Sequence, residues 1–185
     1  MTGAPNLCPD DKMKVLLTQL SSAASDGLSE VDELIWKFPL DPRLHFLRGS
    51  LLAGQRRYDE ARAGMAEAVR IAPDYEIARF QLGFLHMTSG APQEAAEVWE
   101  PLANLEPENP LRLFSCALNM LAQDEFDQAL HYFSEGMRRN VSYPELNKDM
   151  MLLVNTIKQK QQDNGGEAIS SAQMLLRQYK DKTKH

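Results

Sequence analysis

The 185-residue chain contains an internal repeat whose period is about 34 residues. Four sets of positions keep this interval: Gly49, Gly83 and Ala117; Ala61, Ala95 and Ala129; Met65, Trp99 and Phe133; and Pro73 and Pro107, with Val141 where a third proline would fall. A period of this length is typical of small supersecondary units that bury their apolar faces by stacking on their neighbours. The chain is therefore predicted to fold as a linear array of similar units.

Each unit has the pattern of two helices joined by a turn. A first run passes through the small residue at the Gly49 position, and a second run carries an alanine and, four residues later, a bulky side chain. Small residues allow two antiparallel helices to approach closely, and the bulky side chain fills the remaining gap. Proline then ends the second helix, because it lacks the N–H that a helix interior requires. These features predict an all-α fold built from helix hairpins.

The pattern resembles that of the tetratricopeptide repeat (TPR) family, whose unit has the same length. The closest matches are "QLGFLH", "EAAEVW" and "LEPENP", followed by "LRGSLL", "DEARAGM" and "IAPDY", whereas "CALNM", "DQALHYF" and "RNVSY" are looser. This resemblance covers residues 42–143. It implies a right-handed superhelical array of antiparallel helix hairpins, a TPR-like α-solenoid of about ten helices.

The expected organisation extends the repeat in both directions. Its parts are a flexible tail over 1–9, a degenerate hairpin over 10–41, repeats over 42–75, 76–109 and 110–143, capping helices over 144–180, and a flexible tail over 181–185. The capping part is expected to contain a long amphipathic helix over 145–162 and a last helix over 167–179.

Two departures from the repeat pattern have structural consequences. Arg48 and His45 replace a leucine and an aromatic residue, which predicts a more polar seam between the first two hairpins. Pro101 lies within the second helix of the middle unit, where it is expected to kink the helix at a cost of about 3 kcal/mol unless packing compensates.

Composition and charge exclude several classes of function. Residues 1–144 carry 13 basic against 21 acidic side chains, and residues 145–185 carry 7 against 5, so the body is acidic and its basic end is short. No nucleic-acid binding is expected, because an acidic body repels phosphates. The absence of a long apolar run predicts no membrane insertion and a cytoplasmic location. Cys8 and Cys116 are expected to be reduced thiols.

No pattern of catalytic or metal-binding residues is present in the sequence. The four histidines, His45, His86, His131 and His185, have no zinc spacing, and no phosphate-binding loop or nucleophile elbow occurs. His86 is interpreted as a hydrogen-bonded interhelical residue. The chain is therefore predicted not to be an enzyme and to bind no metal or cofactor.

The candidate site is the concave surface that first helices line in such an array. From Phe80, the spacing i, i+4, i+7 selects Phe84 and Met87, and shifts by one repeat period extend the set to other units. The predicted partner-binding residues are Phe46, Ser50, Phe80, Phe84, Met87, Phe114, Leu118 and Leu121. Relatives that grip acidic C-termini place Lys, Arg and Asn on this surface. Here the apolar character indicates capture of an apolar segment instead.

The predicted function is a non-catalytic adaptor or chaperone that binds an apolar extended or helical segment of a protein partner. Two alternatives stay open: a structural assembly module whose groove is filled by its own terminal helix, and self-association of the chain through the same surface. The architecture is also similar to that of the class II chaperones of bacterial type III secretion, small acidic cytoplasmic proteins that hold translocator segments in an apolar groove.

Overall fold

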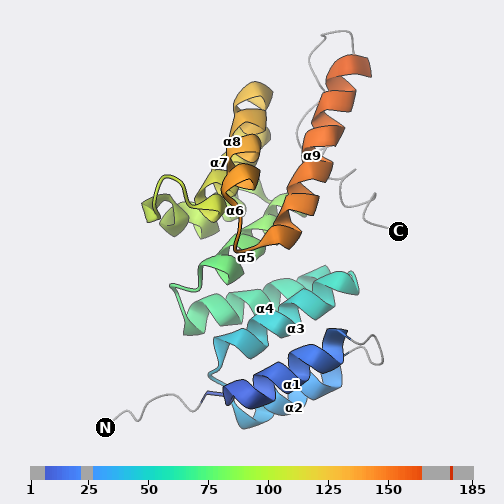
Figure 1. The fold of residues 1–185 in the computed structure, drawn as a ribbon, viewed down its shortest axis with the longest axis vertical. Coiled ribbons are helices and arrows are strands. Elements are labelled where there is room, and N and C mark those ends of the chain that lie inside the picture. Colours follow the sequence, from blue (N-terminus) through green and yellow to red (C-terminus); the bar gives the residue numbers. More distant parts are fainter. Residues whose placement is uncertain (1–6, 22–26, 164–175, 177–185) are drawn as a thin grey trace. The chain divides into compact units, whose positions relative to one another are not determined.

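The computed structural model describes residues 7–21, 27–163 and 176, and within these residues every regular element is a helix (Figure 1). The chain divides into two compact units, 1–82 and 83–185. The all-α fold class is confirmed.

The first unit contains α1 (Asp10–Ser21), α2 (Leu28–Lys37), α3 (Pro42–Gly54), α4 (Tyr58–Ile71) and the beginning of α5 (Glu76–Thr88). The second unit contains the end of α5, α6 (Pro92–Trp99), the 3₁₀-helix η1 (Glu100–Asn104), α7 (Pro110–Ala122), α8 (Phe126–Arg139) and α9 (Pro144–Asp163). The long helix predicted over 145–162 is therefore present as α9. The helix expected over 167–179 lies outside the described residues, apart from the buried residue Leu176. The superhelical hand and the repeat boundaries stay predictions.

Close packing of small against bulky residues holds each hairpin together. A Cβ added to Gly49 of α3 would lie 2.7 Å from Cγ of Met65 and 3.0 Å from the carbonyl oxygen of Ala61, both in α4. In the second unit, a Cβ on Gly83 would lie 2.2 Å from Nε1 of Trp99. These contacts confirm the predicted roles of the glycine, alanine and bulky positions.

The turns inside the three hairpins share one conformation. Arg56, Gly90 and Asp124, which follow one another at the repeat period, have positive φ angles of 62°, 85° and 62°. After each of them the next N–H donates to a carbonyl five residues earlier: Arg57 to Leu52 at 2.9 Å, Ala91 to His86 at 3.0 Å, and Glu125 to Met120 at 3.0 Å. This is the Schellman ending of a helix. Arg56, Gly90 and Asp124 are therefore a further set of equivalent positions in the repeat. The sequence did not reveal this set, because only one of its members is glycine.

Pro101 ends the regular part of the middle hairpin's second helix. The α-helix α6 stops at Trp99, and the chain continues as η1 with Pro101 in its first turn. Proline removes an N–H donor and its ring clashes with the carbonyl four residues earlier, so an α-helical path is unfavourable here. The predicted distortion is confirmed, and it takes the form of a change to 3₁₀ geometry.

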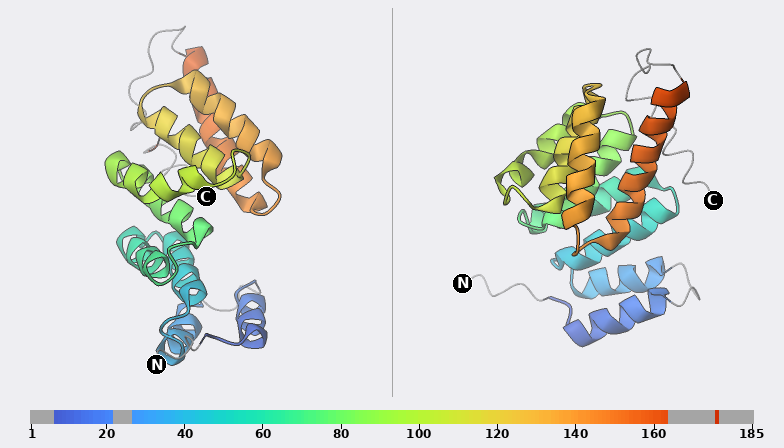
Figure 2. Two further views of the ribbon diagram at one scale, coloured as in Figure 1. Left: turned by 90° about the vertical axis from the view of Figure 1, so that its left-hand side faces the viewer. Right: turned by 45° about the horizontal axis from the view of Figure 1, so that its top comes forward.

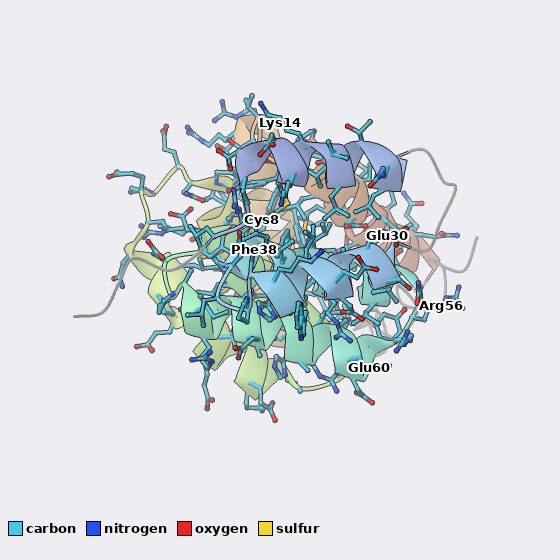
Figure 3. All side chains as sticks on the ribbon, turned by 90° about the horizontal axis from the view of Figure 1, so that it is seen from below. Cys8, Lys14, Glu30, Phe38, Arg56 and Glu60 are labelled. Atoms are coloured by element: carbon cyan, nitrogen blue, oxygen red, sulfur yellow. The ribbon has the colours of Figure 1, made fainter. Side chains whose placement is uncertain are left out.

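The N-terminal helices share one apolar cluster with α3. Its buried members are Cys8, Met13, Leu16, Val31 and Leu44. Cys8 is only 2% exposed, although residues 1–9 were expected to form a flexible tail. Figure 3 shows Cys8 close to Phe38 between α1 and α2. Of the expected tail, Cys8 is thus packed into the fold, whereas Leu7 and Pro9 on either side of it are exposed.

A buried carboxylate explains why Cys8 is held there. Asp41, the N-cap residue of α3, has a fully buried side chain that accepts the N–H of Cys8 at 2.9 Å and the N–H of Arg43 at 3.0 Å. The Arg43 guanidinium donates to Asp41 at 2.8 Å, to Asp10 at 2.7 Å and to the Cys8 carbonyl at 2.6 Å. These bonds connect the start of α1 to the start of α3.

The seam between α2 and α3 is polar, as predicted. Arg48 donates to Asp32 of α2 at 2.7 Å. His45 Nε2 lies 2.8 Å from the carbonyl oxygen of Pro39. These two side chains therefore make hydrogen bonds at positions where apolar residues were expected from the repeat.

A buried asparagine connects α8 to α9, beside the position where the repeat has lost its third proline. Asn140 donates to the carbonyl of Tyr143 at 2.6 Å and to Oδ1 of Asn147 at 2.8 Å, and it accepts the N–H of Tyr143 at 3.0 Å. The next residue, Val141, is 87% exposed. The side chain of Asn140 thus fixes the turn into α9.

Candidate functional site

The eight predicted concave residues occupy the first helices of the three hairpins. Phe46 and Ser50 lie on α3, Phe80, Phe84 and Met87 on α5, and Phe114, Leu118 and Leu121 on α7. Each of the last six is at most 7% exposed, whereas Phe46 and Ser50 are half-buried. Six of the predicted residues therefore present almost no apolar surface to solvent in this structure.

Phe46 and Ser50 form the accessible part of the predicted site. The Phe46 ring packs edge to face on Tyr75, with ring centroids 5.4 Å apart and an interplanar angle of 61°. The Ser50 hydroxyl donates to the carbonyl of Phe46 at 3.0 Å. This hydrogen bond satisfies the hydroxyl locally, so an apolar partner could cover it without leaving its donor unpaired.

Phe114 of α7 packs against α8, the second helix of the same hairpin. A Cβ added to Gly136 of α8 would be 2.5 Å from Cε1 of Phe114. Spacing from Phe80 assigned Phe114 to the concave side, but the small residue on α8 leaves room for the ring inside the hairpin. Partner binding at the predicted residues stays a prediction, and only part of the set is accessible for it.

The described cysteines and His131 show no arrangement that points to chemistry. Cys8 and Cys116 are free thiols, and burial raises the pKa of each. A raised pKa keeps a thiol protonated and poorly reactive. His131 packs edge to face against Tyr132 at 5.8 Å. Among the residues that the structure describes, no group of three or more His, Cys, Asp or Glu side chains is placed to hold a metal ion.

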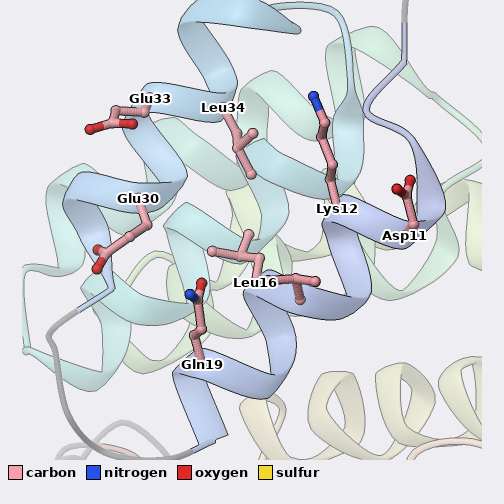
Figure 4. A pocket seen from close by; sticks show the side chains of 8 residues that line it. Asp11, Lys12, Leu16, Gln19, Glu30, Glu33 and Leu34 are labelled. Carbon is pink, nitrogen blue, oxygen red and sulfur yellow. The ribbon is translucent and has the colours of Figure 1, made fainter.

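A groove between α1 and α2 was missed by the sequence reading. It has a volume of about 310 Å³ and is lined by Asp11, Lys12, Val15, Leu16, Gln19, Glu30, Glu33 and Leu34 (Figure 4). Both views of Figure 2 draw α1 and α2, the helices whose residues line the groove, in blue at the N-terminal end of the chain. The sequence signal was weak: two acidic residues three positions apart on one helix normally indicate a solvated face.

Comparison with known proteins supports a TPR-like chain. The chain is 30% identical over 120 residues to Tetratricopeptide repeat protein 34 of Homo sapiens. The similarity covers 60% of this chain and 20% of that relative, so the chain spans about a fifth of the relative's length. No family model matches the sequence. Within the described part of the chain, no helix is long and apolar enough to span a bilayer.

Proposed function

We propose that the chain is a non-catalytic protein-interaction adaptor of the cytoplasm that binds an apolar segment of a partner protein. The observation that carries this proposal is the repeated hairpin, in which Gly49 packs on Met65 and Gly83 on Trp99, together with similarity to a tetratricopeptide repeat protein. Arrays of such hairpins present extended surfaces to other chains. A chaperone role like that of class II secretion chaperones is a narrower form of the same proposal.

The proposed contact is the concave side of the hairpins, beginning at Phe46 and Ser50. These two side chains keep access to solvent beside the ring of Tyr75. An aromatic residue next to a locally satisfied hydroxyl suits an apolar segment, because no polar group must be desolvated without a partner. Contact with Phe80, Phe84, Met87, Phe114, Leu118 or Leu121 would need their present covering to move aside.

The burial of those six residues favours a second candidate function. If the groove is filled within the chain, the protein acts as a structural assembly module that recruits subunits through its outer faces. Self-association of the chain through the concave surface itself is a separate form of assembly.

Site-specific crosslinking separates the two functions. A photo-crosslinking residue placed at Ser50 is expected to capture a partner from native extract, whereas the same residue at Ala63, exposed on α4, is expected to capture none. Ser50→Lys should then lower affinity for the identified partner at least about tenfold, equal to about 1.4 kcal/mol, with Ala63→Lys as the matched control. Capture of only a second copy of the chain would favour assembly. No crosslink from Ser50 would contradict the adaptor site.

A further inference from the structure

We infer that the groove between α1 and α2 binds a cationic amphipathic helix of a partner protein. This inference concerns a different surface from Phe46 and Ser50, and it stands without the concave site. It rests on the shape of the groove, on the charge of its rim, and on the fact that the backbone N–H and C=O groups of its helical walls are already hydrogen-bonded.

The floor of the groove is apolar and part of it is open to solvent. Leu16 and Leu34 lie between the two helices (Figure 4). Val15, which also lines the groove, is 57% exposed. The volume of about 310 Å³ is at the lower end of the roughly 300–1,000 Å³ typical of small-molecule sites. An open groove of this size suits a few apolar side chains of a longer partner.

The rim of the groove is negative. Asp11 stands near the start of α1, and Glu30 and Glu33 stand one turn apart on α2. None of these three carboxylates makes an ion pair or hydrogen bond with another residue of the described structure. They are therefore available to Lys or Arg side chains on either side of an apolar anchor.

The lysine of the groove does not neutralise these carboxylates by direct pairing. The ammonium of Lys12 lies over the ring of Phe38, 5.8 Å from its centroid. Such a cation–π contact holds the charge at the Phe38 end. With three acidic groups and one basic group on the lining, the groove attracts a cationic partner.

The walls indicate that the partner segment is helical. Both walls are α-helices, whose interior N–H and C=O groups are already paired within the helix. An extended segment would find no backbone partners there and would leave its own polar groups unpaired over the apolar floor. A helix satisfies its own backbone, and about three turns of it would match the length of α1.

Binding of designed peptides to the full chain tests this inference. The probe is a synthetic amphipathic helix of Leu, Ala and Lys about 15 residues long, since shorter helices are marginal in water. It should bind the natural chain with a saturable anisotropy signal, and the same peptide with Glu in place of Lys should not. Glu30→Lys with Glu33→Lys should weaken binding on the order of tenfold, and Val15→Ser should weaken it several-fold.

A matched pair of charge reversals controls for general attraction to an acidic protein. Glu94 and Glu97 have the same spacing on α6 and the same positions relative to the helix start as Glu30 and Glu33 on α2, and both are exposed. Glu94→Lys with Glu97→Lys makes the same change in net charge and should alter affinity less than about twofold. Circular dichroism must show unchanged helicity in every variant.

Several results would overturn the inference. The first is that the reversals at Glu94 and Glu97 weaken peptide binding as much as those at Glu30 and Glu33. The others are that the Glu peptide binds as tightly as the Lys peptide, and that the Lys peptide does not bind. Tighter binding of a synthetic peptide of residues 175–185, "LLRQYKDKTKH", would identify the chain's own end as occupant in place of a partner. If the Lys peptide does not bind the groove but Ser50 still crosslinks to a partner protein, the adaptor proposal is unaffected.

Discussion

The Cβ that Gly83 lacks would lie 2.2 Å from the indole Nε1 of Trp99 and 2.4 Å from its Cε2. Trp99 is itself 2% exposed, so the ring has little room to move away. The first and second helices of the middle hairpin can therefore come this close only with glycine at position 83. The same relationship holds between Gly49 and Met65 in the hairpin before it.

Gly83→Ala is expected to destabilise the protein by about 1–3 kcal/mol, because the added methyl overpacks a rigid ring. Gly49→Ala should also destabilise, because the added Cβ would meet the backbone carbonyl of Ala61 at 3.0 Å as well as Cγ of Met65 at 2.7 Å. Urea unfolding followed by circular dichroism measures both. Gly54→Ala is the control: it lies in the last turn of α3 with nothing within 4 Å of the added Cβ, and it should stabilise by about 0.5–1 kcal/mol. Equal stability of the Gly83 and Gly54 variants would contradict this account.

Arg56→Gly is expected to stabilise the hairpin of α3 and α4. Arg56 is exposed and has a φ angle of 62°, a conformation that costs an L-residue about 1–2 kcal/mol. Glycine removes that cost but loses more conformational entropy on folding, so the net gain should be about 0.5–1 kcal/mol. Thermal unfolding should show a higher Tm. Arg57→Gly, one residue later at a φ of −83°, should give no gain, and a similar gain there would show that the turn conformation is not the cause.

The buried carboxylate of Asp41 should make stability depend on acid pH. Burial alone would raise the pKa of Asp41, but hydrogen bonds from the Arg43 guanidinium and from the N–H groups of Cys8 and Arg43 outweigh it and lower the pKa. The unfolded value is about 3.9. A lowered folded pKa contributes stability that is fully present well above pH ~4 and is lost as the pH falls through the folded pKa.

Asp41→Asn tests this contribution directly. It should destabilise the protein by about 2–3 kcal/mol at pH 7, because Arg43 loses its buried anionic partner. The difference between variant and natural chain should shrink as the pH is lowered from 5 toward 2. Asp59→Asn, on an almost fully exposed carboxylate that pairs with Arg62, should change stability by less than about 0.5 kcal/mol at any pH. A constant difference across the pH range would exclude Asp41 ionisation as the cause.

Asn140→Ala should loosen the attachment of α9 to α8. The variant leaves the Tyr143 N–H without its acceptor and removes two donated bonds, which should cost about 1–3 kcal/mol. Hydrogen exchange should show faster exchange at the start of α9 than in α3 or α4. Asn155→Ala, exposed on α9, provides the comparison and should leave exchange unchanged. Uniformly faster exchange across the chain would indicate global destabilisation instead.

Contacts inside a hairpin were predictable because they depend on residues close in sequence. The repeat period placed Gly49 opposite Met65 and Gly83 opposite Trp99, and it identified Pro101 as a point of distortion. The shared turn at Arg56, Gly90 and Asp124 could not be predicted, since positive φ is uncommon for residues other than glycine and only one of the three is glycine.

The sequence by itself determined that this protein is all-α and which small residues let the helices of a hairpin approach closely. Only the tertiary structure decided which apolar side chains are exposed. Helical spacing places Phe80, Phe84 and Met87 on one face, yet all three are buried, while Val15 on α1 is exposed beside a groove lined by carboxylates. The reason is that periodicity within one helix defines a face, whereas burial depends on what packs against that face, and this is set by residues distant in sequence.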